Sequence, residues 1–143
     1  MLLCLETVGV FFIKLYRAVL NVLLKLKKYL LPIVWAVVIA VLSLGPAPNL
    51  PQSDFLAPDK AAHTFVYGLL VYLALRARSI DGKPNLYLII GVILASTAYG
   101  FFLEVLQKTF FPYRYFEWGD VIANTVGSIA GYFVFKLSKK DVG

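Results

Sequence analysis

The 143 residues are 60% hydrophobic and 15% charged, with a mean hydropathy of +0.78. A soluble domain of this length still exposes a substantial share of its surface, so it has no room to bury so much apolar area, and lipid must be part of its solvent. The formal net charge of +6 does not indicate nucleic acid, because the basic residues flank apolar segments.

Residues 1–28 are predicted to form an amphipathic helix on the membrane surface. A polar stripe recurs there at spacings of three and four, opposite an apolar face: Lys14, Arg17, Asn21, Lys25 and Lys28. The alternative is that Leu2 to Leu24 crosses the bilayer at a tilt. Because Glu6 interrupts the apolar run and no small-residue cleavage site follows, we expect this segment to be retained.

The remaining chain, residues 29–143, is predicted to be an all-α, integral membrane four-helix bundle. Prolines, glycines and charges divide it into four apolar helices, at about residues 29–44, 59–77, 86–106 and 119–137. The connections are a proline-rich loop at 45–58, a polar turn at 78–84 and an aromatic segment at 110–119. Aromatic rings of this kind favour the membrane interface.

The basic residues predict which side of the membrane each connection faces. The N-terminal segment, the turn between the second and third spans, and the C-terminal end hold 11 of the 14 Lys and Arg residues. By the positive-inside rule, both termini are cytoplasmic and the proline-rich and aromatic connections face outward.

The last span carries small residues four apart, at Gly119, Ala123, Gly127 and Gly131. Such stripes let helices approach closely in lipid, so we interpret them as packing surfaces. Gly91 and Ala95, with Ser96 and Gly100, predict a similar seam on the third span.

Polar residues gather at the predicted outward ends of the same spans. Asp59, His63 and Tyr67 form a row on one helix face, as do Asp120 and Asn124, while Glu104 is a neighbour of Gln107. One interpretation is a hydrogen-bonded network that only holds the helices together. Charges near hydrocarbon are costly, however, and their restriction to one membrane face favours a functional site.

The ordered motifs Asp59-Lys60-x-x-His63, Glu104-x-x-Gln107, Arg114 and Asp120-x-x-x-Asn124-x-x-Gly127 resemble those of the VanZ-like family of small bacterial membrane proteins. The resemblance covers about residues 30–137. It implies a location in the bacterial cytoplasmic membrane and a role at the cell envelope, because the family is named after a protein linked to teicoplanin resistance. This chain has Pro112-Tyr113-Arg114 where members often have a Pro-Gly-Arg-like turn.

The chemistry favours a site for an anionic lipid or lipid-linked envelope precursor. Lys60 and Arg114 supply donors for phosphate or carboxylate, and Gln107 and Asn124 orient the ligand. If the site is catalytic, His63, oriented by Asp59, and the carboxyls of Glu104 and Asp120 are the acid–base groups. The partners are thus membrane lipids, with no nucleic acid.

Other functions stay open. Catalytic signatures such as Gly-x-Ser-x-Gly or His-Glu-x-x-His are missing, so whether the protein is an enzyme is undecided. A non-catalytic accessory protein that modulates envelope composition or glycopeptide susceptibility is the main alternative, and transport is a third. We expect no cofactor and no metal, although a site with one His and several carboxylates is an alternative that spacing alone does not define.

Overall fold

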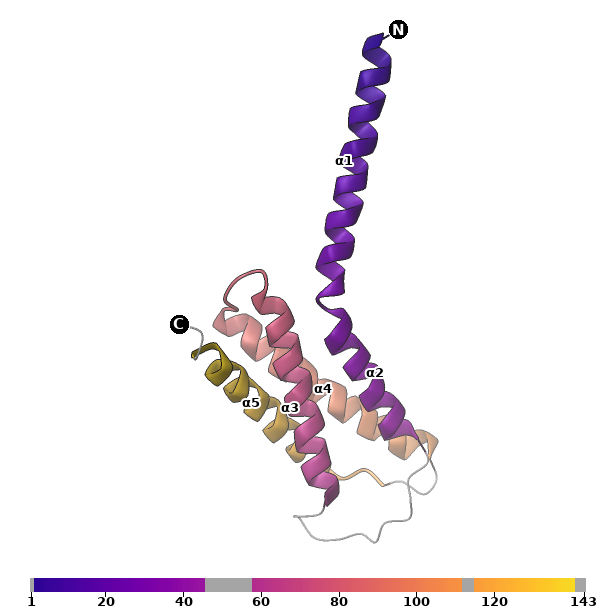
Figure 1. Ribbon diagram of the computed structural model, residues 1–143. Coiled ribbons are helices and arrows are strands. Elements are labelled where there is room, and N and C mark those ends of the chain that lie inside the picture. Colours follow the sequence, from indigo (N-terminus) through magenta and orange to yellow (C-terminus); the bar gives the residue numbers. More distant parts are fainter. Residues whose placement is uncertain (1, 46–57, 112–114, 141–143) are drawn as a thin grey trace.

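The computed structural model describes residues 2–45, 58–111 and 115–140, and within these ranges every regular element is a helix. Figure 1 shows the five helices: α1 (Leu2–Lys27), α2 (Leu30–Leu44), α3 (Pro58–Ser79), α4 (Leu86–Phe110) and α5 (Trp118–Lys140). The all-α prediction is confirmed. The predicted spans correspond to α2–α5, except that α4 continues past Leu106 to Phe110.

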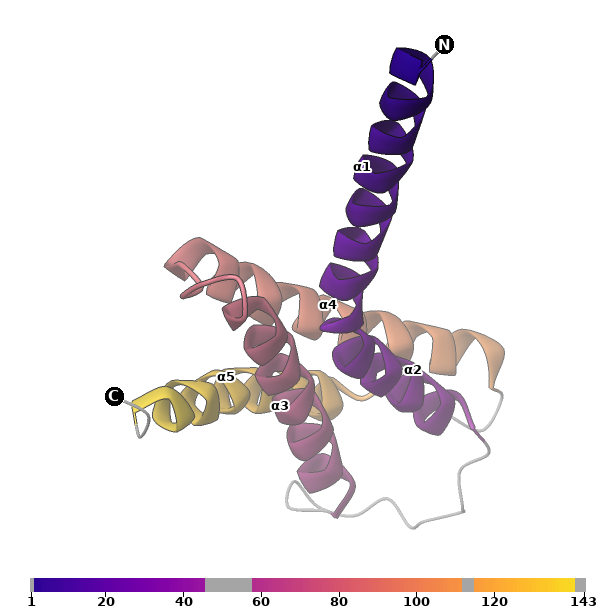
Figure 2. The same ribbon diagram turned by 45° about the horizontal axis from the view of Figure 1, so that its top comes forward.

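The boundary between α1 and α2 has a local cause. Pro32, in the first turn of α2, lacks the N–H that would donate to the Lys28 carbonyl, and its ring would crowd that group in a continuous helix. The chain turns at Lys28 and Tyr29, where the Tyr29 N–H donates to the Leu26 carbonyl at 2.9 Å. In both views α1 extends away from the other helices (Figures 1 and 2).

The surface of α1 is exposed wherever its side chains are described. Residues 13–23 are all exposed, including large apolar side chains such as Tyr16, Val19 and Leu23. These residues therefore pack against no other helix. The placement of α1 along the membrane surface stays a prediction.

Helices α2–α5 pack against one another, with α3 and α5 forming the most extensive pair. Two aromatic side chains attach α2 to its neighbours through hydrogen bonds. Trp35 Nε1 on α2 donates to the Val66 carbonyl of α3 at 2.9 Å, and the Tyr99 hydroxyl on α4 donates to the Ala36 carbonyl of α2 at 2.7 Å. Buried Ser96 and Ser128 connect α4 to α5 through their hydroxyls at 2.9 Å. Such bonds satisfy polar groups that lipid leaves without partners.

Glycines allow α3 and α5 to approach to backbone contact. A Cβ on Gly127 would overlap the Thr64 carbonyl, and one on Gly131 would overlap the Gly68 carbonyl. The Thr64 hydroxyl also lies 3.4 Å from the Ala123 carbonyl. The predicted packing role of Gly127 and Gly131 is confirmed. These contacts fix α3 and α5 in register, with their N-termini at the same end.

The predicted seam on α4 is confirmed only in part. Ser96 and Gly100 are buried, whereas Gly91 and Ala95 are exposed, and a Cβ on Gly91 would meet nothing within 4 Å. The expectation that Gly91 and Ala95 pack against another helix is therefore wrong for the described residues, because these two residues lie on a different face of α4 from the buried Ser96, Gly100 and Leu103.

Two helices, α4 and α5, are long and apolar enough to cross a membrane. Helix α2 is apolar but has 15 residues, or about 22 Å, against a hydrocarbon core of about 30 Å. Helix α3 has 22 residues and carries several charges. The chain is thus a helical membrane protein, and the count of four spans stays a prediction.

Candidate functional site

Polar side chains from α3, α4 and α5 converge at the end where α3 and α5 begin. Asp59, Lys60 and His63 occupy the first turns of α3, and Asp120 and Asn124 those of α5. Glu104 approaches from the C-terminal part of α4. Because α3 and α5 start side by side while α4 runs the opposite way, polar residues at three helix ends meet at one end of the molecule.

His63 is held between three side chains. Its Nδ1 lies 3.0 Å from Asn124 Oδ1, so the ring N–H at this position donates to the amide oxygen. Its Nε2 lies 3.8 Å from Asp59 Oδ1 and 3.8 Å from Asp120 Oδ2. Below the imidazole, Tyr67 stacks at 6.4 Å between ring centroids and is 1% exposed. The predicted row of Asp59, His63 and Tyr67 on one face of the helix is confirmed.

Lys60 is the cation of the cluster. Its Nζ donates to Glu117 Oε2 at 3.0 Å and to Asp120 Oδ1 at 3.2 Å. The two partners differ in environment, because the side chain of Asp120 is 9% exposed and that of Glu117 is 42% exposed. The aliphatic part of Lys60 lies against Gly119, where a Cβ would come within 2.8 Å of Lys60 Cε. The predicted stripe of small residues therefore also makes room for this side chain.

Asn124 and Glu104 form the buried floor of the site. Asn124 is 0% exposed, and its Nδ2, directed toward Gly100, has no hydrogen-bond partner among the described residues. Glu104 is 2% exposed and has the Glu117 backbone and the carboxylates of Asp120, Glu117 and Asp59 among its electrostatic neighbours.

Gln107, a predicted ligand-binding residue, contacts the end of α2. The Gln107 side chain donates through Nε2 to the Ser43 carbonyl at 2.7 Å, which holds the end of α2 against α4. Its role in orienting a ligand stays a prediction. Arg114 lies outside the described residues, so its predicted role stays a prediction too. Sequence reasoning did not assign Glu117 to the site, although its position three residues before Asp120, at a helix start, was a usable signal.

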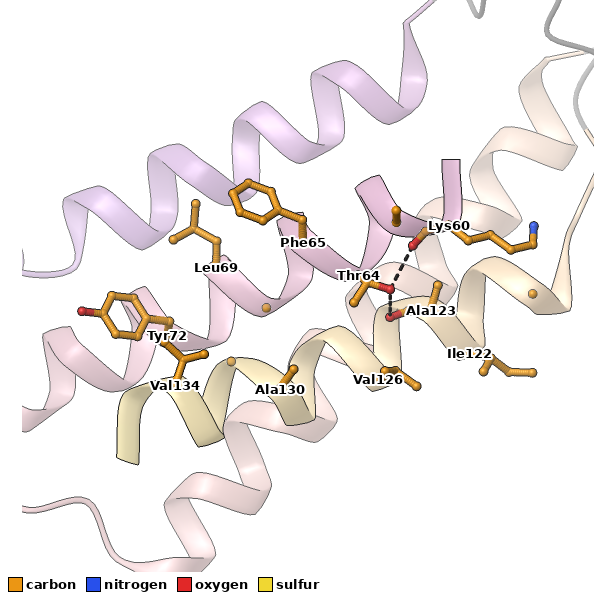
Figure 3. A pocket seen from close by; sticks show the side chains of 14 residues that line it. Lys60, Thr64, Phe65, Leu69, Tyr72, Ile122, Ala123, Val126, Ala130 and Val134 are labelled. Carbon is orange, nitrogen blue, oxygen red and sulfur yellow. Dashed lines mark hydrogen bonds between the residues drawn. The ribbon is translucent and has the colours of Figure 1, made fainter. Parts of the chain in front are cut away.

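An apolar groove of about 700 Å³ runs between α3 and α5 and ends at Lys60. In Figure 3, Lys60 lies at one end, while Tyr72 and Val134 lie at the other. The walls are side chains such as Phe65, Leu69, Ile122 and Val126, and the floor includes Gly68 and Gly131. The groove is a consequence of the glycine contacts, because residues without side chains leave a furrow along the helix pair.

The charges of the cluster do not balance. Asp59, Glu117 and Asp120 supply three carboxylates, with Glu104 nearby, whereas Lys60 is the one lysine or arginine that pairs with them among the described residues. Lys108, in the last turn of α4, is a second cation at this end of the molecule. Three ligand-type atoms, one each from Asp59, His63 and Asp120, lie within 4.8 Å of one another. Such a set suits proton exchange or a cation.

A family model described as VanZ/LLP1 matches residues 8–139. The matched range begins within α1, so it extends further toward the N-terminus than the motifs of the site. No curated protein and no solved structure matches the chain.

Proposed function

Because this chain belongs to the VanZ/LLP1 family, we propose that it acts in the cell envelope by binding an anionic lipid or lipid-linked envelope component. The headgroup lies at the polar cluster, and an acyl chain lies in the groove between α3 and α5. The observation that carries this proposal is the continuity of the two: the groove is apolar along its length and ends at Lys60.

The dimensions of the groove suit one lipid chain. From Lys60 to Tyr72, α3 rises about 18 Å, which compares with about 15 Å for half of the hydrocarbon core. Helices in a membrane are covered by lipid, so the occupant of an apolar groove on their outer surface is an acyl chain. Lys60 at its end supplies a charge-assisted donor for phosphate or carboxylate.

An incoming anion has to compete for Lys60. Glu117 is the exposed partner of this lysine, whereas Asp120 is buried beside it. A headgroup therefore replaces Glu117 at the ammonium group and leaves the Asp120 pair in place. The predicted donor Arg114 precedes Glu117 by three residues and adds a second cation in this proposal.

Filling the groove tests this proposal. Ala61 and its neighbour Ala62 are both exposed, but only Ala61 lines the groove. Ala61→Trp is expected to reduce retention of anionic phospholipid by at least about tenfold, since an indole occupies the chain's place and costs about 1.4 kcal/mol or more of binding. Native mass spectrometry from nanodiscs containing phosphatidylglycerol and phosphatidylcholine measures the bound lipid.

Ala62→Trp is the matched control and is expected to retain lipid as the unaltered protein does. Equal retention by both tryptophan variants, or no preference for phosphatidylglycerol, contradicts the proposal. The mass of the bound lipid also separates binding from turnover, because a hydrolase or transferase changes it.

We further infer that the site faces outward and both termini are cytoplasmic. Arg76, Arg78 and Lys83 lie at the opposite end of α3 and α4 from the cluster, where Lys28 pairs with Asp81. The positive-inside rule favours the cytoplasm for that end. In a Cys4→Ser background, Lys83→Cys should resist an impermeant thiol reagent added to intact cells, whereas Trp118→Cys should react. The reverse pattern contradicts this orientation.

A further inference from the structure

The geometry points to a metal site in which Asp59, His63 and Asp120 bind a divalent ion, either Mn²⁺ or Zn²⁺. The inference concerns the same cluster as the proposed lipid site and deepens that proposal, because a metal with three protein ligands keeps open positions for a headgroup oxygen. Metal binding is measurable without lipid, so a failure of the metal proposal can be distinguished from a failure of the lipid proposal.

The first argument is the arrangement of the ligand atoms. His63 Nε2 lies 3.8 Å from an oxygen of each aspartate, and the three atoms lie within 4.8 Å of one another. A tetrahedral Zn²⁺ with bonds of about 2.0–2.2 Å holds its ligand atoms about 3.3–3.6 Å apart. Small side-chain rotations therefore bring all three atoms to coordination distance. The set combines imidazole with carboxylates, which suits Mn²⁺ and Zn²⁺ better than Mg²⁺ or Ca²⁺.

The second argument is that His63 has the protonation pattern of a metal ligand. Because Nδ1 donates to Asn124 Oδ1, the free lone pair of a neutral imidazole is on Nε2, which faces the two carboxylates. Three electron-rich atoms that face one another attract a cation. One metal ion can contact all three atoms at once, whereas a single N–H at Nε2 points in one direction, and both oxygens lie 3.8 Å from Nε2, beyond the hydrogen-bond range of about 2.7–3.2 Å.

The third argument is the buried Asp120. Its side chain is more than nine-tenths buried, and Lys60 takes only Oδ1. Oδ2 accepts no hydrogen bond from a described residue and lies 3.8 Å from His63 Nε2. One oxygen of this carboxylate is therefore left to bind a cation. A metal ion at this position satisfies Oδ2 and also offsets the excess of negative charge in the cluster.

The surroundings match those of metal-binding histidines. Ligating imidazoles almost always donate their second ring N–H to an oxygen, which fixes the tautomer and the plane of the ring. Here the accepting oxygen is Asn124 Oδ1. Asn124 is thus a positioning residue. Asp59, with a side chain 57% exposed, is the ligand on the open side, through which an ion enters.

Metal uptake by the full-length protein in lipid-free detergent micelles tests the inference. After chelation and removal of the chelator, Mn²⁺ and Zn²⁺ are titrated separately, with Mn²⁺ followed by electron paramagnetic resonance and Zn²⁺ by equilibrium dialysis. We expect one ion per chain and nitrogen hyperfine coupling from His63 to Mn²⁺. His63→Ala should abolish this coupling, and Asn124→Ala should weaken affinity by about 10–100-fold.

Asp81→Asn is the matched control, because it removes a carboxylate at the opposite end of α3, where Asp81 pairs with Lys28. It should leave uptake unchanged. Circular dichroism and size-exclusion chromatography of each variant separate loss of the site from loss of the fold, and Asp120→Asn keeps the side-chain shape while removing the ligand charge. Failure of both ions to bind at millimolar concentration, or binding unaltered by His63→Ala and Asp120→Asn, overturns the inference. Metal binding together with unchanged lipid retention in Ala61→Trp would instead reject the lipid proposal alone.

Discussion

Gly131→Ala is expected to destabilise the protein by about 1–3 kcal/mol or more, because one added methyl group has no place between α3 and α5. The new Cβ would overlap the Gly68 carbonyl, and backbone atoms of a helix have no rotamer by which to withdraw. Gly127→Ala meets the Thr64 carbonyl in the same way. Each substitution forces α3 away from α5 and disturbs the site that their N-termini form.

Gly91→Ala is the control for this prediction. A Cβ there meets nothing within 4 Å, and alanine has the better helix propensity by about 1 kcal/mol, so stability should stay the same or rise. Thermal unfolding of the three variants in one detergent provides the comparison. If Gly131→Ala unfolds at the same temperature as Gly91→Ala, the close packing of α3 on α5 is wrong.

Lys60→Met is expected to cost about 3–5 kcal/mol of stability, because it leaves a buried carboxylate without its cation. Methionine keeps most of the aliphatic length that packs against Gly119, so the effect isolates the charge. The Asp120 side chain is 9% exposed and loses the 3.2 Å bond from the ammonium group. Unfolding by denaturant in the presence of a chelator measures the loss without compensation by a bound ion.

Two further variants make this prediction specific. Glu117→Gln removes the exposed partner of Lys60 and should cost about 0–1 kcal/mol. Lys60→Met combined with Asp120→Leu removes both buried charges and should recover much of the loss. A loss in Glu117→Gln as large as that in Lys60→Met would show that burial does not govern the ion pairs of this cluster.

The helices were predictable because their ends carry strong local signals. Pro58 opens α3, Lys27 and Lys28 precede α2, and Gly45 follows it, so the boundaries of α2 and α3 agree with expectation to within two residues. The end of α4 was placed four residues too early, at Leu106, because apolarity was taken as the criterion. The backbone continues beyond the apolar run, and the Phe111 N–H still donates to the Gln107 carbonyl at 3.0 Å.

The convergence of polar residues was predictable for a similar reason. Spacings of four residues place Asp59 with His63, and Asp120 with Asn124, on single helix faces whatever the tertiary structure. The small-residue stripe then indicated which face of α5 is buried, and Asn124 lies on it.

Pairings between helices could not be derived from the sequence. Whether Lys60 meets Glu117, or Gln107 meets Ser43, depends on the register and rotation of packed helices, which no local pattern specifies. The same limit explains Gly91, a small residue on α4 that no helix covers. It also explains the groove, which exists only because α3 and α5 are in contact along their glycines.

The account depends on one claim, that the polar cluster and the groove together hold a lipid. An experimental structure of the protein in a bilayer of native lipids tests this claim most directly. We expect density for an acyl chain between α3 and α5, with its headgroup within hydrogen-bond distance of Lys60 Nζ. A groove filled by protein side chains, or an ordered headgroup only at the Lys28 end of the helices, would contradict it.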